Sequence, residues 1–408
     1  MLIRNAIDKQ FNATKYQKQK LTRLLGNNVN LVKSNNKNLY ENKFKSGMGM
    51  SRIQYRFHEP GDKGIIIPSF LDNNKICSVI GAPMCAGQRK SGVDLGPKQL
   101  RDAGLIDNIK NLGWLVNDYG DLNFPSISKA KYQEPLIKST TNTTADDNND
   151  IEEYIPGRVP RNSTIVGNSL EVIYNSISHA HKQKSFVLTL GGDHSIGAAT
   201  VLSVLSHRPQ TGIIWVDAHA DINTPETSNT GNLHGMPIAL AMKLCDRESV
   251  PGMSWMKGKP ILDPKQIVYI GLRDLDPGER RFIRNLGIKA FTMHEVDKYG
   301  IGEVMRQTFK HLSLPNGEIR PLHLSYDIDA CDPAIAPATG TLVRGGFSFR
   351  EAHYIAEAAA STGCLGSMDL VEVNASLMPK TYEENESADM TVQLGVALIS
   401  SAMGSRIL

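Results

Sequence analysis

The sequence predicts an α/β fold built around a parallel β-sheet, and three observations lead to that prediction. Three short apolar runs are bounded by Gly, Pro or polar residues, a pattern typical of buried parallel strands. A cluster of polar side chains directly follows each run, which is where open α/β sheets gather their ligands. The chain has 408 residues, of which 40% are hydrophobic and 21% are charged. This is enough to bury the core of one large domain with additional segments.

Each of the three expected strands carries a short polar motif at its carboxyl end. Because the carboxyl ends of parallel strands lie at one edge of a sheet, motifs far apart in sequence can converge in one crevice. We therefore expect the three motifs to form a single site. In chain order, the strands and motifs are residues 185–190 before GGDHS at 191–195, residues 211–216 before DAHAD at 217–221, and residues 321–326 before DID at 327–329.

The composition of these motifs favours a metal site. Apart from Asp193, which we expect to orient its turn through hydrogen bonds, they supply two imidazoles and four carboxylates. Such oxygen-rich sites suit manganese or magnesium better than zinc. Asp217, His219 and Asp221 occupy alternate positions, so in extended backbone their side chains share one face, and the DID motif repeats that spacing. Each motif alone is also compatible with a solvated turn or a structural histidine, so their combination carries the prediction.

Five blocks of sequence resemble the arginase/ureohydrolase family and occur in the family's order. The resemblance runs from about residue 81 to the C-terminus and is interrupted by one insert. It implies a three-layer α/β/α sandwich with an eight-stranded, mostly parallel sheet, and usually a homotrimer. The stretch GQRKSGV at 87–93 resembles the family's first loop less closely. The five blocks are GGDHSI at 191–196, DAHADINTP at 217–225, GNLHG at 231–235, SYDID at 325–329 with Asp332 and Pro333, and PATGT at 337–341.

The resemblance implies a binuclear manganese site with two Mn2+ per subunit, bridged by Asp217 and Asp327. Four carboxylates leave two dications near neutral, so a metal-bridging water can lose a proton and become the hydroxide nucleophile. The implied ligands are His194, Asp217, Asp221 and Asp327 for one ion, and His219, Asp217, Asp327 and Asp329 for the other.

The implied substrate carries a guanidinium group. This group is planar, cationic and poorly electrophilic, so its hydrolysis needs a carboxylate that orients it and a nucleophile aimed at its carbon. By resemblance, Glu372 is the orienting carboxylate, Asp221 passes a proton to the departing amine, and His234 relays protons between bulk water and the site. The implied reaction is the hydrolysis of L-arginine to L-ornithine and urea.

The other end of the substrate decides which guanidine is accepted. By resemblance, the segment 223–234 holds the α-carboxylate, with Asn223, Thr230 and Asn232 as contacts, and Asp276 holds the α-amino group. Thr341 matches a position near the guanidinium. Thr230 stands where many family members carry serine, and because the hydroxyl donor is kept, we expect altered affinity at most.

Three other functions compete with arginine hydrolysis. An agmatinase or another guanidine hydrolase is the first, although the loop at 223–235 favours arginine because agmatine lacks a carboxylate. A non-catalytic arginine-binding module is the second, but such a module should have lost metal ligands, and all six are present. A zinc deacetylase of related fold is the third, and it would need only one metal.

Two segments fall outside the family pattern. Residues 1–52 form a polar N-terminal extension rich in Asn and Lys, and residues 53–408 form the arginase-like catalytic domain. A transit peptide is an alternative for the extension, although Arg and Ser are sparse there. A polar, low-complexity insert is expected at about 130–168, because it carries too little apolar surface to order itself.

Composition limits the partners and the compartment. A net charge of +3 gives no reason to expect nucleic acid, and without a run of 18 or more apolar residues we expect no membrane span. The five cysteines are odd in number and lack Cys-x-x-Cys spacing, which favours a reducing, cytoplasmic location. The resemblance implies L-arginine and further copies of the chain as partners.

Other conspicuous residues have expected roles outside the chemistry. By resemblance, Arg350, Glu351 and Arg406 are candidates for contacts between subunits. Histidines without a motif partner, including His181 and His323, are expected to be structural or to face solvent.

Overall fold

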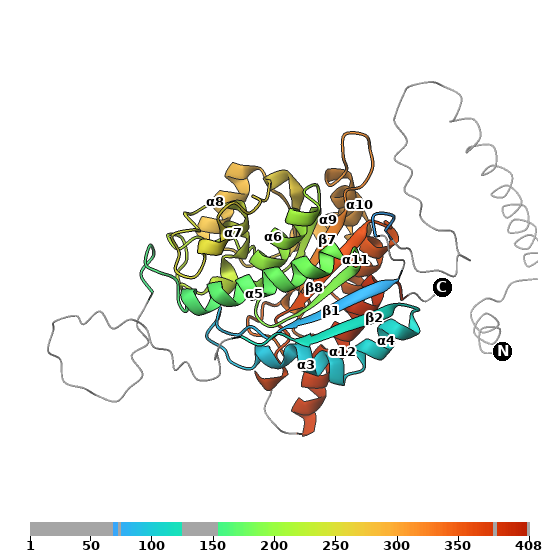
Figure 1. The fold of residues 1–408 in the computed structure, drawn as a ribbon. Helices are drawn as coiled ribbons and strands as arrows, with labels where there is room; N and C mark the ends of the chain where they lie inside the picture. Colours follow the sequence, from blue (N-terminus) through green and yellow to red (C-terminus); the bar gives the residue numbers. More distant parts are fainter. Residues whose placement is uncertain (1–67, 72–74, 125–153, 378–381, 406–408) are drawn as a thin grey trace, which may run out of the picture. The chain divides into compact units, whose positions relative to one another are not determined.

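The middle layer of the fold is an eight-stranded sheet in which every pair of neighbouring strands is parallel. We describe residues 68–71, 75–124, 154–377 and 382–405 of a computed structural model (Figure 1). The strand order is β2-β1-β3-β8-β7-β4-β5-β6. The strands are β1 Ile76–Ala82, β2 Leu115–Asp121, β3 Phe186–Gly191, β4 Gly212–Val216, β5 Ile267–Leu272, β6 Lys289–Thr292, β7 Leu322–Asp327 and β8 Leu365–Val371.

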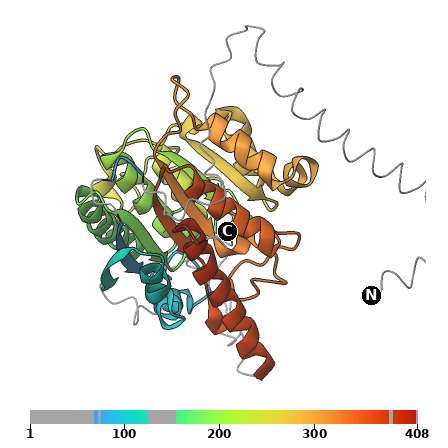
Figure 2. The same cartoon turned by 90° about the vertical axis from the view of Figure 1, so that its right-hand side faces the viewer.

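Helices cover both faces of this sheet, which confirms the predicted three-layer α/β/α architecture (Figure 1). Figure 2 shows the face on which α11 and α12 pack against each other. One face carries α5 Ser163–Lys182, α6 Gly197–His207, α7 Pro237–Met242 and α8 Pro277–Leu286. The other carries α3 Gly96–Asp102, α4 Leu105–Asn111, α9 Met293–Tyr299, α10 Ile301–His311, α11 Phe349–Ser361 and α12 Tyr382–Ala402.

Short 3-10 turns connect several of these elements, and three of them carry predicted site residues. The three are η4 His194–Ile196, η5 Leu233–Gly235 and η8 Ile328–Ala330. The others are η2 Val93–Leu95, η6 Ser254–Met256, η7 Pro264–Gln266 and η9 Ala375–Leu377.

The central strands are apolar on both faces because helices bury both sides. In β4, Ile213 and Trp215 join the core beneath α5 and α6, whereas Ile214 and Val216 join the opposite core. Each such side chain contributes about 1.5–3 kcal/mol through burial. The three strands expected from sequence are present as β3, β4 and β7; β3 and β7 are shifted by one residue toward the C-terminus, and β4 begins one residue later than expected.

The topology brings the predicted motifs to one edge. β3 and β4 follow each other in sequence but are not neighbours in the sheet, because the later strands β8 and β7 lie between them. The carboxyl ends of four neighbouring strands, β3, β8, β7 and β4, therefore lie side by side, and the residues that follow them can form one site.

The structure corrects the end of the predicted insert. The boundary at residue 168 lies inside α5, which begins at Ser163, and Tyr154 is already buried. The segment before α5 orders because it packs against a loop at 223–232, a tertiary contact that its polar composition does not reveal. The remainder of the insert that lies in 125–153, the extension at 1–52 and Arg406 fall outside the described residues.

Two further expectations concern cysteines and membranes. All five cysteines are free thiols. In the described part of the chain, no helix is both long and apolar enough to cross a bilayer.

Candidate metal centre and active site

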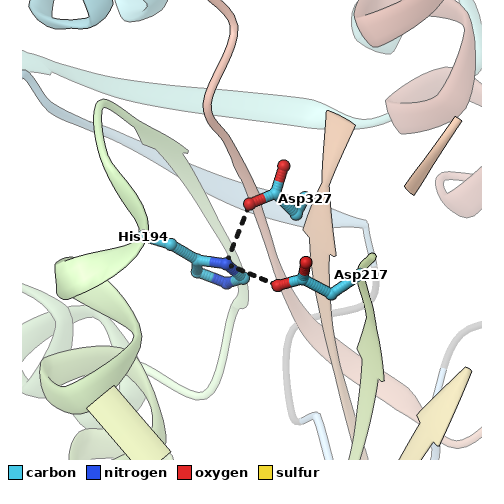
Figure 3. A group of neighbouring side chains, drawn as sticks. All are labelled: His194, Asp217 and Asp327. Atoms are coloured by element: carbon cyan, nitrogen blue, oxygen red, sulfur yellow. Dashed lines mark hydrogen bonds and ion pairs between the residues drawn. The ribbon is translucent and has the colours of Figure 1, made fainter. Parts of the chain in front are cut away.

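His194, Asp217 and Asp327 form the first cluster of potential metal ligands. His194 follows β3, Asp217 follows β4 and Asp327 ends β7, and their side chains point toward one another (Figure 3). His194 Nδ1 lies 3.1 Å from a carboxylate oxygen of each of Asp217, Asp221 and Asp327. The four side chains are buried, so water competes poorly for their ligand atoms.

Asp217, His219 and Asp329 form a second cluster. His219 Nδ1 lies 3.4 Å from Asp217 Oδ1 and 3.2 Å from Asp329 Oδ2. Asp217 therefore presents Oδ2 to one imidazole and Oδ1 to the other, as a bridging carboxylate does. Asp327 belongs only to the first cluster, with His194 and Asp217, and its Oδ1 accepts the backbone N–H of Asp329 at 2.8 Å.

Local turns bring the side chains of the DAHAD and DID motifs together. The expectation that these motifs have extended backbone is therefore wrong. Asp217 accepts the N–H of His219 at 2.7 Å, and Asp327 does the same for Asp329 two residues further on. This is the turn that an aspartate forms with its own backbone. Asp329 lies in η8, and Asp221 has a left-handed backbone with φ 51°. The Asp-x-His and Asp-x-Asp spacings therefore encode turns.

A tryptophan orients both halves of the first cluster. The ring of Trp215 stacks on His194 with centroids 4.1 Å apart and an interplanar angle of 6°. Its indole N–H donates to Asp217 Oδ2 at 3.0 Å. Sequence reasoning missed this role, because Trp215 reads as one more apolar residue of a buried strand.

A buried chain of hydrogen bonds fixes which nitrogen of His194 faces the cluster. The hydroxyl of Ser325 donates its one proton to Asp369 Oδ1 at 2.6 Å. It must therefore accept the Nε2–H of His194, 2.9 Å away, which leaves Nδ1 toward the carboxylates. His323 Nε2 lies 3.0 Å from Asp369 Oδ2, so this histidine is structural, as expected. The sequence contains one signal for this chain of hydrogen bonds: Ser325, His323 and Asp369 are polar residues inside the otherwise apolar strands β7 and β8, and buried polar groups need partners.

The electrostatics of the site favour bound cations. Burial alone would lower the pKa of His194, but its contacts with Asp217, Asp221 and Asp327 raise it well above the ordinary value. Burial, with repulsion by Asp329 and Asp217, raises the pKa of Asp327 well above its ordinary value. Burial and Asp217 raise the pKa of Asp221 to about 6. Burial and mutual repulsion thus oppose the ionisation of Asp221 and Asp327, and divalent ions would relieve this repulsion. The donor set fits two such ions.

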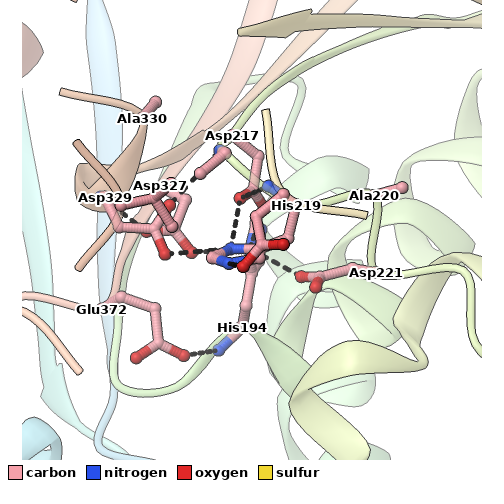
Figure 4. Close-up of polar contacts among 12 residues, drawn as sticks. His194, Asp217, His219, Ala220, Asp221, Asp327, Asp329, Ala330 and Glu372 are labelled. Carbon is pink, nitrogen blue, oxygen red and sulfur yellow. Dashed lines mark hydrogen bonds and ion pairs between the residues drawn. The ribbon is translucent and has the colours of Figure 1, made fainter. Parts of the chain in front are cut away.

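Glu372 follows β8 and lies beside the first cluster (Figure 4). Its Oε1 accepts the backbone N–H of His194 at 2.9 Å and lies 3.3 Å from His234 Nδ1. Burial opposes ionisation of Glu372, yet His234 lowers its pKa below the ordinary value. Burial opposes the charge on His234 as well, and Glu372 raises its pKa to about 9. Glu372 has a left-handed backbone with φ 65°. Its backbone N–H donates to the carbonyl of Gly192, which stabilises this conformation.

The residues predicted for the amino-acid end lie on polar loops. Asn223 Nδ2 donates to Asp276 Oδ2 at 2.8 Å, so the structure brings these two together. Thr230 is exposed, and its Oγ1 accepts the backbone N–H of Asn232 at 3.2 Å. Thr341 is exposed on the loop after η8.

Comparisons with known proteins agree with this arrangement. The model of the arginase family matches residues 75–404, which is most of the chain. The chain belongs to the arginase family.

Individual members of the arginase family extend this match. An arginase from Glaciozyma antarctica (strain PI12) is 41% identical over 341 residues, which are 83% of this chain and 90% of that protein. The native structure of the arginase from Bacillus caldovelox superposes with a TM-score of 0.68 at 35% identity, covering 82% of this chain and 100% of that one. The Entamoeba histolytica arginase in complex with L-ornithine gives a TM-score of 0.65 at 28% identity, covering 81% and 99%.

In this arginase-family chain, the segment before α5 supports the loop that bears Thr230. The Tyr154 hydroxyl donates to the carbonyl of Pro225 at 3.1 Å, and its ring lies against Gly231. A Cβ on Gly231 would approach that ring to 2.3 Å, and Gly231 has φ +70°, so glycine is required there. The Arg161 guanidinium donates to the carbonyl of Thr230 at 2.9 Å. The C-terminal part of the predicted insert, which contains Tyr154 and Arg161, therefore packs against this loop and stabilises it.

Proposed function

We propose that the protein is an arginase that hydrolyses L-arginine to L-ornithine and urea. The observation that carries this proposal is the bond from the His194 N–H to Glu372 Oε1, which joins the candidate metal centre to the candidate guanidinium site. Membership of the arginase family supports the same reaction.

We propose two Mn2+ ions as the cofactor. His194, Asp217, Asp221 and Asp327 would hold one ion, and His219 and Asp329, with Asp217 and Asp327, would hold the other. Manganese suits a site with four carboxylates and two imidazoles, and when bound it would supply acidified water for attack on the guanidinium carbon.

The chain's own residues orient the substrate and move protons. Glu372 would pair with the guanidinium and turn its carbon toward the metal centre. Asp221 would transfer a proton to the departing amine, and His234, which is half-buried, would connect the site with bulk water. Thr341 would contact the guanidinium from the loop after η8.

The polar loops would select the amino-acid end. Asn223, Thr230 and Asn232 would donate to the α-carboxylate, and Asp276 would accept from the α-amino group. Agmatine has the amine and lacks the carboxylate, so an agmatinase, the alternative function, would have no use for the first three contacts.

We propose that this arginase assembles as a homotrimer. Arg350 lies exposed at the start of α11, beside a groove of about 700 Å3 that Phe349 and Tyr354 also line. Both aromatic side chains are exposed, Phe349 by 52% and Tyr354 by 42%, which suits a contact with another chain. Glu351 already accepts from the Ser348 N–H at 2.9 Å and caps α11, so Arg350 is the stronger interface candidate. Light scattering should give three chains per particle, and an unchanged mass for Arg350→Ala would count against its role.

We further propose that residues 53–408 are the catalytic domain, that 1–52 are an extension outside it, and that the protein acts in the cytoplasm. Free thiols fit a reducing compartment. Imaging a C-terminally tagged full chain tests the location, and signal confined to an organelle would contradict it.

The first experiment measures urea released by chelator-stripped protein with and without added Mn2+. L-Arginine and agmatine are assayed in parallel. Manganese-dependent urea from arginine alone is the expected result. Urea from agmatine alone would make the protein an agmatinase, and no urea from either, despite two bound metals, would favour a non-catalytic arginine-binding module.

A further inference from the structure

The loop at 85–90, which follows β1, is seated against the active site by its backbone. The Gly87 N–H donates to Asp193 Oδ2 at 2.8 Å, and the Gly87 carbonyl accepts the N–H of His234 at 3.1 Å. A Cβ on Gly87 would lie 2.7 Å from Asp193 Oδ1, so only glycine allows this close approach. The loop is thus held between the turn after β3 and the residue proposed to relay protons.

Gln88, the next residue, reaches Glu372. Its side chain is buried, with 4% exposed, and its Nε2 donates to Glu372 Oε2 at 2.7 Å. An ionised carboxylate only accepts hydrogen bonds, so the amide must present its NH2 group to Glu372. The amide oxygen then lies toward Gly340, where an added Cβ would come within 2.9 Å of it.

Glu372 is consequently held at both carboxylate oxygens. The backbone of His194 holds Oε1, and Gln88 holds Oε2. Two donors on two oxygens fix both the position and the plane of the carboxylate. The plane matters because a guanidinium pairs with a carboxylate through two parallel N–H···O bonds, so the carboxylate sets the orientation of its partner.

We propose that Gln88 is a positioning residue that sets the plane of Glu372 and, through it, the orientation of the substrate guanidinium relative to the metal centre. This inference rests on the proposed function, since it assigns Glu372 to the guanidinium. Without Gln88, the carboxylate keeps its anchor at Oε1 but can rotate about its last bond, which weakens binding and misaligns the carbon to be attacked.

The test compares Gln88→Met with Lys90→Met in the full-length protein loaded with Mn2+. Methionine preserves the length of glutamine and removes the donor. Lys90 Nζ donates to the Gly340 carbonyl, so it ties the same loop to the same neighbour and has no part in holding Glu372. The readouts are kcat and KM for L-arginine, the inhibition constant of L-ornithine, metal content and melting temperature.

Gln88→Met should lower kcat/KM for arginine about ten- to a hundredfold, the effect of losing a hydrogen bond to a charged group. Both a lower kcat and a higher KM should contribute. Ornithine lacks the guanidinium, so its inhibition constant should stay within about twofold, as should all kinetic constants of Lys90→Met. A purely structural role would reduce the active fraction, which lowers kcat and leaves KM unchanged.

The proposal is overturned if KM for arginine does not rise in Gln88→Met, if ornithine weakens equally, or if Lys90→Met reproduces the loss. Should Gln88→Met lose metal or melt early, Gln88→Asn replaces it, because this variant keeps an amide in the pocket but withdraws it from Glu372, with the same expected kinetics. Failure of the wild type to release urea from arginine would instead refute the proposed function.

Discussion

The metal centre and the loops at the amino-acid end are both polar, but the fold holds them in different ways. His194, Asp217 and Asp327 are buried at the ends of central strands and are supported from below by Trp215 and Ser325. Among the residues proposed to read the amino-acid end, Thr230 is exposed and Asn232 is half-exposed on a loop, where the Thr230 hydroxyl accepts the Asn232 N–H, and only Asn223 is buried.

The difference in burial between the two regions suggests that the centre determines metal binding and catalysis, whereas the loop determines which substrate is accepted. Changing a group in the centre leaves buried charges unpaired and disturbs the sheet that carries them, so large effects on metal binding should follow. Changing a loop residue removes one contact that water can partly replace, so its effect should be confined to substrate affinity. Substitutions should therefore have their largest effects at the metal ligands and their smallest effects in the loop.

Asp217 should matter most, because it belongs to both ligand clusters, whereas Asp329 belongs to one. In Asp217→Ala, bound manganese should fall from about two ions per chain to almost none, and in Asp329→Ala to about one. Both variants should lose at least about a thousandfold in urea release, since metal ions contribute several kcal/mol to such reactions. Metal analysis of gel-filtered protein measures the content. Retention of two ions by Asp217→Ala would break the bridging assignment.

Trp215→Phe should weaken metal binding without removing a ligand. Phenylalanine keeps an aromatic ring near His194 but loses the N–H donated to Asp217. Loss of such a supporting bond typically costs about 10–100-fold in metal affinity. Trp114→Phe is the control, because Trp114 is buried too and donates to the carbonyl of Met403, away from the ligand clusters. Competition with a chelator gives the affinities, and equal losses in both variants would show that general stability is responsible.

Much of this contrast could be predicted from the sequence, because its strongest signals are local. The apolar runs predicted β3, β4 and β7 to within one residue, and the motifs behind them marked the edge where the candidate ligands meet. Parallel strands determine that edge once they are recognised. The arginase-family resemblance supplied the number of strands and the role proposed for Glu372.

What sequence could not supply depends on contacts between distant segments. The bond between His323 and Asp369 joins β7 to β8 across 46 residues, and no periodicity signals it. The left-handed backbone of Glu372 is held by the carbonyl of Gly192 on another strand end, so the residue type alone gives no hint of it. The ordered end of the insert likewise depends on Tyr154 packing on Gly231.

Asp276→Asn should affect the substrate end alone. The amide keeps a polar group at the start of α8 but loses the charge that pairs with an α-amino group. KM for arginine and the inhibition constant of ornithine should rise together, about 10–100-fold, since both ligands carry that amine. Metal content should not change. Asp263→Asn, the same substitution at the start of η7, is the control. A rise for arginine without one for ornithine would place Asp276 nearer the guanidinium than proposed.

Thr230→Val should give the smallest effect. Valine keeps the shape of threonine and removes the hydroxyl, which accepts the N–H of Asn232 and is proposed to bind the α-carboxylate. Thr230 is exposed, so water can partly replace its bond to the carboxylate; a loss of about 1 kcal/mol is expected, and KM for arginine should rise about fivefold at unchanged kcat. Thr230→Ser should match the wild type, because the hydroxyl is retained. Agmatine has no carboxylate, so any turnover of it should be equal in all three proteins. An effect on agmatine, or a change in metal content, would mean that this loop also supports the centre, and the separation between chemistry and selectivity would then fail where the two regions meet.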